Sequence, residues 1–236
     1  MGDINPVAHF LSLVAGTRRM ADAAGPGFVI IDTPGLIEGP GRALNACQIE
    51  SLCPDVIVAL QRGGELEPTL RAYRQHPAIR LAPSPRAIPK SSAARRRARE
   101  EAFGAHFAGG RDVVADAQRI MVQRARLFIG EPFDDPRFLY AERMSEGIIA
   151  IGDSTAGAAP KVRVLPPDFA DHLLCGVLDA QGGCRGLAIL ERINWRRRRF
   201  HLFTPVARGR MRGLQFGDLR LARDGRVLPH KALREL

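Results

Sequence analysis

A run of four apolar residues, Phe28–Ile31, ends at the tetrapeptide Asp32–Gly35 (Asp-Thr-Pro-Gly), and this stretch constrains the fold more than any other. Three of the four are β-branched, a composition typical of a strand that is buried on both faces of a parallel sheet. In open α/β sheets, ligands lie beyond the carboxyl ends of such strands. We therefore predict a buried strand at residues 28–32, with a polar edge at Asp32 of the kind that handles phosphate or magnesium.

Helices and strands alternate through the first part of the chain. Apolar spacing predicts helices from Asn5-Pro6 to Gly25, at 42–52 and at 65–73, and further buried or sheet strands at 56–60 and 79–81. This alternation predicts a three-stranded parallel sheet with helices on its faces. The fold class is therefore α/β: an incomplete parallel sheet of the P-loop-kinase type with flanking helices, followed by a small β-rich domain.

An arginine-rich helix is predicted after the proline-containing connector at residues 83–89. Ser91 and Ser92 can cap this helix, and Phe103 and Phe107 give it one apolar edge. Such a helix is either a solvated face or a phosphate-binding face. Its position directly after a sheet strand, on the edge that holds the Asp32 loop, favours binding. Four arginines, Arg95, Arg96, Arg97 and Arg99, lie within about a turn and a half of this helix.

The C-terminal part of the chain has the pattern of a β domain. Residues 112–136 predict an edge strand and an acidic, proline-rich loop, so we place a domain boundary near residue 135. The predicted domains are residues 1–135, which include the arginine-rich helix at about 91–107, and residues 136–236. Trp195 and the four arginines after it fall in a hairpin loop, where they either contact a phosphate backbone or are solvated. Strands are predicted at 147–152, 172–179, 184–193, 199–203 and 219–221, with a hairpin turn at 180–183.

Arginine dominates the charge of this chain. The formal net charge is +10, and the sequence holds only three lysines, Lys90, Lys161 and Lys231. The planar fork of arginine suits phosphate, so nucleic acid or nucleotide is a reasonable partner, although a GC-rich genome produces the same bias without a binding role. None of the three lysines follows a glycine, which excludes a Walker A loop, G-x-x-x-x-G-K-[ST], from this sequence.

Other chemistry is not indicated. The four cysteines form no C-x-x-C pair and have no histidine at metal-ligand spacing, so we expect reduced thiols and no metal site of the chain's own. No apolar run approaches the ~20 residues that span a bilayer. The N-terminus has no export signal, so we expect a cytoplasmic protein with no membrane partner.

The order of several short motifs resembles one enzyme family. These motifs are Gly2–Pro6, Gly16–Arg19, Asp32–Gly35, Pro54–Gln61, the connector at 83–85, the arginine-rich helix, Gly176–Asp179, Gly186–Leu190 and Thr204-Pro205. Together they resemble the second half of the RNA-processing polynucleotide 5′-hydroxyl kinases, the P-loop kinases of pre-mRNA 3′-end, tRNA and ribosomal RNA processing. The resemblance implies magnesium-dependent transfer of the ATP γ-phosphoryl group to 5′-hydroxyl ends of RNA or DNA.

The resemblance also implies roles for individual residues near the Asp32 loop. Thr33 and Gly35 would form the clasp that holds the nucleic acid near its 5′ end, and Asp32 is a possible magnesium or phosphate edge. Leu36 stands where the family often has tryptophan, so base stacking at this point is weakened.

The same resemblance assigns the arginine-rich helix to catalysis. Arg95 and Arg99, four residues apart and with Arg96 close by, match the lid arginines that close over the triphosphate and steady its charge.

The family's Walker A loop, its helix and the following acidic strand would all precede Gly2, and this sequence does not contain them. Our first hypothesis is therefore a fragment or truncated form of a polynucleotide 5′-hydroxyl kinase, which alone binds ATP very weakly and transfers nothing. The alternative is a non-catalytic nucleic-acid-binding or scaffold protein derived from that family. A third interpretation, the D-x-x-G switch of a GTPase at Asp32–Gly35, ranks last because the chain has no Asn-Lys-x-Asp guanine motif. An in-frame G-x-x-x-x-G-K-[ST] in the coding DNA upstream of Met1 would favour the first hypothesis.

Overall fold

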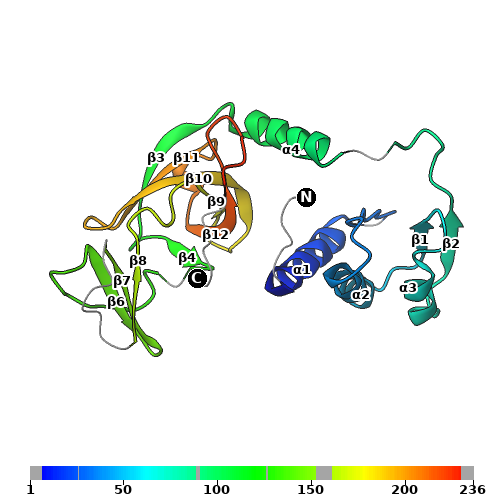
Figure 1. Cartoon of the computed structure of the whole chain (residues 1–236), viewed down its shortest axis with the longest axis horizontal. Helices are drawn as coiled ribbons and strands as arrows, with labels where there is room; N and C mark the ends of the chain where they lie inside the picture. The colour runs from blue at the N-terminus through cyan, green and yellow to red at the C-terminus, as the bar shows by residue number, and fades with distance from the viewer. Residues whose placement is uncertain (1–6, 26, 89–90, 126, 153–160, 230–236) are drawn as a thin grey trace. The chain divides into compact units, whose positions relative to one another are not determined.

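The computed structural model describes residues 7–25, 27–88, 91–125, 127–152 and 161–229 of the chain. The chain forms two compact units, Met1–Ser92 (unit 1) and Ala93–Leu236 (unit 2), which we describe separately (Figure 1). This division lies earlier in the chain than the predicted boundary near residue 135. Compactness does not test which residues descend from a kinase domain, so the domains 1–135 and 136–236 stay a prediction.

Unit 1 is a small α/β arrangement. Its elements are α1 (Val7–Ala23), α2 (Pro40–Leu52), β1 (Ile57–Leu60), α3 (Glu67–Ala72) and β2 (Ala78–Leu81). The two strands pair in parallel, with Ile57 opposite Ala78 and Leu60 opposite Leu81. These elements confirm the helices and strands predicted between residues 42 and 81, to within a few residues at each end. The helix predicted from Asn5-Pro6 is present as α1, but its predicted cap lies outside the described residues.

The predicted strand at residues 28–32 is wrong. The chain is irregular there, and the side chains of Phe28 and Ile30 are 104% and 93% exposed. A strand in a parallel sheet needs a hydrogen-bonded neighbour along its length, which sequence propensity cannot supply. Within the described residues, no segment pairs with residues 28–32, so the parallel sheet of unit 1 has two strands where three were predicted.

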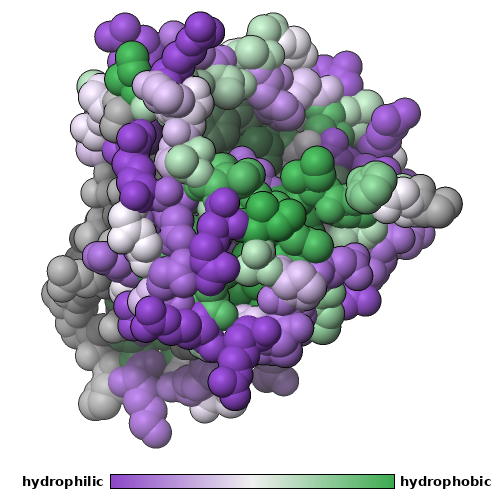
Figure 2. Space-filling model, turned by 90° about the vertical axis from the view of Figure 1, so that its right-hand side faces the viewer, coloured by the Kyte–Doolittle hydropathy of each residue, from purple (hydrophilic) through white to green (hydrophobic). Residues whose placement is uncertain are grey.

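Apolar side chains of the two-stranded sheet are open to solvent. Of the strand predicted to be buried at 56–60, only Ala59 is buried, while Val58 and Leu60 are exposed. Ile79 and Leu81 of β2 are exposed as well. Figure 2 shows apolar side chains gathered into a patch on the side of the molecule where β1 and β2 lie in Figure 1. The two strands therefore have the apolar composition typical of a buried sheet, although most of their large apolar side chains are exposed.

The described residues of unit 2 form one α-helix, a short 3₁₀ turn and two sheets. A six-stranded sheet has the order β3-β11-β10-β9-β12-β4, and a four-stranded sheet has the order β5-β6-β7-β8. Apart from η1, a 3₁₀ turn at Arg208–Arg210, the elements are α4 (Ser92–Phe107), β3 (Arg111–Asp116), β4 (Met121–Gln123), β5 (Glu131–Pro132), β6 (Tyr140–Met144), β7 (Gly147–Ile151), β8 (Val162–Leu165), β9 (Leu173–Leu178), β10 (Cys184–Asn194), β11 (Arg199–Thr204) and β12 (Gly213–Arg220).

The β-rich character of the C-terminal part is thus confirmed, as is the turn between β9 and β10. The edge strand predicted within residues 112–136 is β3, which pairs with β11 at one edge of the six-stranded sheet. No helix in the described part of the chain has the length and apolar character needed to cross a membrane.

An aromatic cluster occupies the core of unit 2. The rings of Phe128 and Trp195 stack with centroids 5.9 Å apart, and Tyr140, Phe169 and Phe200 pack around them. Trp195 is only 5% exposed, and its Nε1–H donates to the Pro167 carbonyl at 2.9 Å. The loop between β10 and β11 therefore begins from a fixed core residue, and the arginines after it are presented from a rigid base.

Candidate nucleic-acid interface

The Asp32–Gly35 loop of unit 1 runs along the surface before α2. Asp32, Thr33 and Gly35 are exposed, so their polar groups face solvent. The loop contains no regular hydrogen-bonded element, and it reaches α2 through Gly39, whose φ of 53° lies in the left-handed region, and Pro40 at the first turn. Both residues suit a sharp entry into a helix.

A close backbone contact holds the end of this loop in place. Gly41, in the first turn of α2, approaches the carbonyl group of Leu36 so closely that a Cβ at Gly41 would overlap it. Asn45 Nδ2, one turn later, donates to the same carbonyl oxygen at 3.5 Å. Leu36 is half-buried as a result, whereas Thr33 and Gly35 just before it remain open. The three predicted residues Asp32, Thr33 and Gly35 are thus displayed together on one anchored loop.

The arginines of α4 fall into two groups. Arg96 is engaged within unit 2, because its Nε lies 3.0 Å from Glu100 Oε1 and its Nη2 donates to the Val227 carbonyl at 3.2 Å. Arg95 is exposed, and Arg99 is half-buried. The Nε–H of Arg99 is buried and has no hydrogen-bond partner among the described residues. Since Arg95 and Arg99 are four residues apart, they lie on the same face of the helix.

α4 is packed tightly against the rest of unit 2. Phe107 is fully buried in a cluster with Ile189 and Leu221. A Cβ on Gly104 would lie 2.9 Å from the Asp224 carbonyl oxygen, and a Cβ on Gly225 would overlap the backbone of Gly104. Gly225 also has a φ of 89°, which favours glycine. The helix that carries Arg95 and Arg99 is therefore fixed at its C-terminal half by contacts that only glycine permits.

The predicted site residues are divided between the two units of the chain. Asp32, Thr33 and Gly35 belong to unit 1, whereas Arg95 and Arg99 belong to unit 2. Among the residues that the structure describes, no group of three or more His, Cys, Asp or Glu side chains could hold a metal ion. Asp32 is a single exposed carboxylate, and magnesium is commonly held by one or two carboxylates together with substrate phosphates, so its role as a magnesium or phosphate edge stays a prediction.

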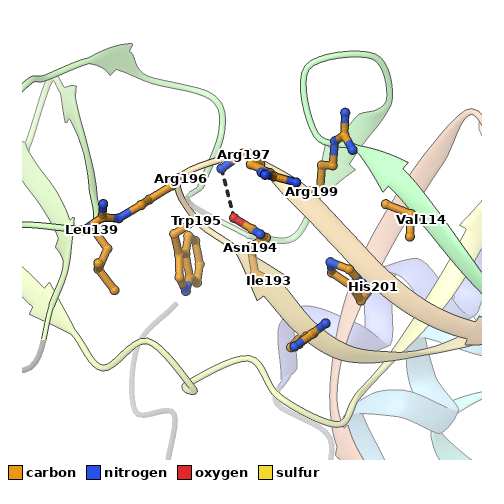
Figure 3. A pocket seen from close by; sticks show the side chains of 10 residues that line it. Val114, Leu139, Ile193, Asn194, Trp195, Arg196, Arg197, Arg199 and His201 are labelled. Atoms are coloured by element: carbon orange, nitrogen blue, oxygen red, sulfur yellow. Dashed lines mark hydrogen bonds between the residues drawn. The ribbon is translucent and has the colours of Figure 1, made fainter.

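A second basic surface lies on the β10–β11 hairpin of unit 2. A cavity of about 560 Å³ is lined by Val114, Leu139, Arg192, Ile193, Asn194, Trp195, Arg196, Arg197, Arg199 and His201. Figure 3 shows Arg196 extending toward Leu139, and Asn194 Oδ1 accepting a hydrogen bond from the Arg197 N–H, which are 3.0 Å apart. This bond fixes the loop from which Arg196 and Arg197 project.

The sequence analysis found part of this surface. It singled out the Trp195–Arg199 run as a hairpin loop, which the structure confirms, but it gave no role to Arg192 or His201. Their signal is the alternation on the two strands, because Arg192 and His201 are cross-strand partners in the β10–β11 ladder. Two residues opposite each other in an antiparallel pair point to the same face of the sheet.

Comparison with known proteins adds to these observations. The family described as "mRNA cleavage and polyadenylation factor CLP1 P-loop" matches residues 1–109. A polyribonucleotide 5′-hydroxyl-kinase of Pyrococcus abyssi is 31% identical over 247 residues, and the alignment covers 97% of this chain and 70% of that protein. The chain belongs to the polyribonucleotide 5′-hydroxyl-kinase family. The Pyrococcus horikoshii member of this family is 30% identical, with 97% of this chain and 68% of that protein covered.

The fold of this family member also resembles a solved structure. The structure of the wild-type Clp1p–Pcf11p complex superimposes with a TM-score of 0.51 at 13% sequence identity, and covers 89% of this chain. The chain spans about half of that solved chain, 50% of its length. The likeness shows a CLP1-like fold: mixed α/β, with a small parallel sheet and a β-rich part.

Proposed function

We propose that this chain forms the RNA-handling part of a polynucleotide 5′-hydroxyl kinase. In this proposal the Thr33–Gly35 loop clasps the 5′ end of RNA, and Arg95 and Arg99 of α4 close over the triphosphate of ATP. The observation that carries the proposal is the Arg99 guanidinium, whose Nε–H is buried without a partner in the described residues. A buried donor of this kind is costly unless a ligand satisfies it, and an anionic oxygen is a strong acceptor.

The reaction requires little covalent chemistry from the protein. The 5′-hydroxyl oxygen forms a bond to the γ-phosphorus as the bond to the ADP oxygen breaks, and the hydroxyl proton is lost. Negative charge spreads over the equatorial oxygens during transfer, and two guanidinium groups on one helix face stabilise that charge. Arg96 instead holds the helix in place through Glu100 and the Val227 carbonyl.

Two parts of the reaction are left to residues outside these 236. The sequence contains no Walker A loop, which in P-loop kinases cradles the phosphates. Magnesium supplies charge neutralisation when it is bound, but the residues around Asp32 do not fit it as a complete site, so we derive no step through the metal. By this proposal the chain alone binds ATP very weakly and transfers no phosphate.

The exposed strands of unit 1 support the proposal that other residues complete the kinase site. Parallel sheets are covered on both faces, yet Val58, Leu60, Ile79 and Leu81 are open to solvent. Further parallel strands and helices would bury these side chains and complete a P-loop-kinase sheet. Residues 28–32, with the composition of a buried strand, would then gain the neighbours that they lack in the described residues.

End-specific binding tests the proposal. Single-stranded RNAs labelled at the 3′ end and differing only in a 5′-hydroxyl or a 5′-phosphate are titrated with the chain by fluorescence anisotropy. We expect tighter binding of the 5′-hydroxyl RNA, and a loss of that preference in Thr33→Val, which keeps the side-chain shape and removes the hydroxyl. The matched control is Thr69→Val, in α3 of the same unit. Equal affinity of the unaltered chain for both ends would overturn the clasp.

The second candidate function is a non-catalytic RNA-binding protein of the same family. The cluster of arginines on the β10–β11 hairpin favours it, because such positive charge binds RNA without regard to its ends. It predicts steep salt dependence, no effect of ATP and no preference between the two ends. The anisotropy titration, repeated over a salt series with and without ATP, therefore separates the two functions.

A further inference from the structure

The four arginines that line the β10–β11 cavity differ from six other arginines of unit 2 in lacking a carboxylate partner in the part of the chain that the structure describes. Within the described residues, the guanidinium groups of Arg192, Arg196, Arg197 and Arg199 make neither an ion pair nor a hydrogen bond. By contrast, carboxylate partners lie within 4 Å of Arg96, Arg119, Arg137, Arg185, Arg223 and Arg226. Four like charges within eight residues repel one another unless an anion lies between them.

Acidic residues on the same strands do not neutralise this cluster. Asp112 and Glu191 both pair with Arg223. Asp116 accepts a hydrogen bond from the Gln118 N–H at 3.0 Å and lies 3.9 Å from Arg119. Asp116 is also the cross-strand partner of Arg199, so one carboxylate lies beside the cluster, and the four arginines leave the cavity with a net positive charge.

The cavity also has an apolar component. Val114 and Leu139 contribute aliphatic side chains beside the arginines, and Ile193 and Trp195, both almost fully buried, also line the cavity. His201 adds a flat ring. Its pKa is lowered by burial and by the neighbouring Arg192 charge, so the imidazole is neutral at pH 7 and offers both a donor and an acceptor. A ligand that fits this cavity has anionic groups that pair with the arginines and a flat, partly apolar group that packs on Val114, Leu139 and His201.

We propose that this cavity is a second RNA-binding surface, which holds an internal single-stranded segment of the substrate through its phosphates and at least one base. Arginine forks match phosphate oxygens, and a base with its ribose matches the aliphatic and imidazole lining. An acidic peptide would satisfy the charge but would not use the flat apolar part. The inference goes beyond the proposed clasp and lid, because it concerns nucleotides away from the reacting 5′ end.

The position of the cavity supports a separate role. α4 packs through Phe107 on the part of β10 that contains Ile189, whereas the cavity lies at the other end of the strand, around the β10–β11 loop. Figure 1 shows α4 and the β10–β11 loop well apart within unit 2. An RNA held here would make its contacts independently of the arginines on α4.

A pair of matched double variants tests the inference in the full chain. Arg196→Ala with Arg197→Ala removes two exposed charges at the cavity, and Arg208→Ala with Arg210→Ala removes two exposed charges on η1 of the same unit. Binding of a 3′-labelled single-stranded RNA is measured over a salt series. The cavity variant is expected to bind roughly tenfold more weakly at low salt, with a slope of log K against log salt reduced by about 1.4. The η1 control is expected to change affinity less than about twofold.

Three outcomes would overturn the inference. The first is an equal loss in both double variants, which would mean a general charge effect. The second is displacement of the RNA by polyglutamate as readily as by unlabelled RNA, which would make the surface a protein site. The third is a loss confined to 5′-hydroxyl RNA, which would make the cavity part of end recognition. If the chain shows no end preference but the cavity variant still loses affinity for both RNAs, the proposed clasp fails and this inference stands.

Discussion

The carboxylate of Glu100 accepts a hydrogen bond from the backbone N–H of Val227 at 3.0 Å, which ties the middle of α4 to the residues that follow β12. Arg96 links the same two residues, because it pairs with the Glu100 carboxylate and donates a hydrogen bond to the Val227 carbonyl. The N-terminal half of the helix, where Arg95 and Arg99 lie, is thus positioned by side chains, and its C-terminal half by glycine contacts.

The Glu100 contact predicts a pH dependence of stability. The Val227 N–H and then the Arg96 guanidinium lower the pKa of Glu100 below 4.5, so folding favours its ionised form. A carboxyl group with a lowered pKa in the folded chain contributes stability that is full above its ordinary pKa and is lost as the pH falls through the lowered value. We expect Glu100→Gln to be less stable than the unaltered chain at pH 7, with the difference shrinking below pH 4.5. Thermal melting over a pH series measures this, and parallel curves would contradict it.

Substitutions at Gly225 and Gly182 distinguish backbone strain from overpacking as the cost of replacing glycine by alanine. Both have positive φ, 89° and 78°, but a Cβ on Gly182 meets nothing within 4 Å, whereas one on Gly225 overlaps Gly104. Gly182→Ala is therefore expected to cost only the backbone strain, about 1–2 kcal/mol. Gly225→Ala adds overpacking of about 1–3 kcal/mol to the same strain. Urea unfolding measures the free energy of unfolding of both variants. Equal losses would show that α4 can shift at Gly104 to make room for the added methyl group.

Glu142 is expected to be a stability determinant of unit 2. Its carboxylate is fully buried and accepts backbone hydrogen bonds from Phe128, Ile129 and Gly130 at 2.8–3.1 Å, and one from the Tyr140 hydroxyl. Glu142→Ala leaves these donors without an acceptor, so we expect a loss of about 3 kcal/mol or more. Glu142→Gln keeps one acceptor oxygen and is expected to cost less.

The control for Glu142 is Glu131→Gln, at an exposed position of β5. It is expected to change the free energy of unfolding by no more than about 0.5 kcal/mol. If Glu142→Ala behaves like this control, the 128–130 loop has another source of order.

Arg99 and Arg97 provide a test of the lid. Both are on α4, but Arg97 is exposed and lies two residues from Arg95 and Arg99, off the face that they share. In an assembly made active by the part of the Pyrococcus abyssi kinase that this chain does not match, Arg99→Ala is expected to lower kcat roughly 10³-fold. Arg97→Ala is expected to stay within about threefold of the unaltered assembly. Similar rates for the two variants in a γ-phosphoryl transfer assay would remove Arg99 from catalysis.

Local sequence pattern was sufficient for much of the secondary structure. Helix α2, the strands β1 and β2, the arginine-rich helix and the β9–β10 hairpin all follow from apolar spacing, caps and turn residues. Long-range pairing was not accessible in the same way. β3 pairs with β11 more than eighty residues away, and no pattern within residues 111–116 identifies that partner.

Residues 28–32 show the other limit of the sequence. Phe28 to Ile31 have high β propensity, but propensity measures how well a side chain fits a sheet that already exists. The same limit applies to the site, because the spacing of Arg95 and Arg99 predicts a shared helix face but not the buried, unpartnered Nε of Arg99. It also could not show that Arg96 is occupied by Glu100.

The packing of Gly104 against Gly225 has a consequence for how the arginines become available. The C-terminal half of the helix is held by backbone-to-backbone contact, so we expect its amide protons to exchange with solvent only when the turn at residues 222–225, after β12, opens as well. The arginines of α4, which we propose contact phosphate, would then be held in position only when the β-rich unit is folded.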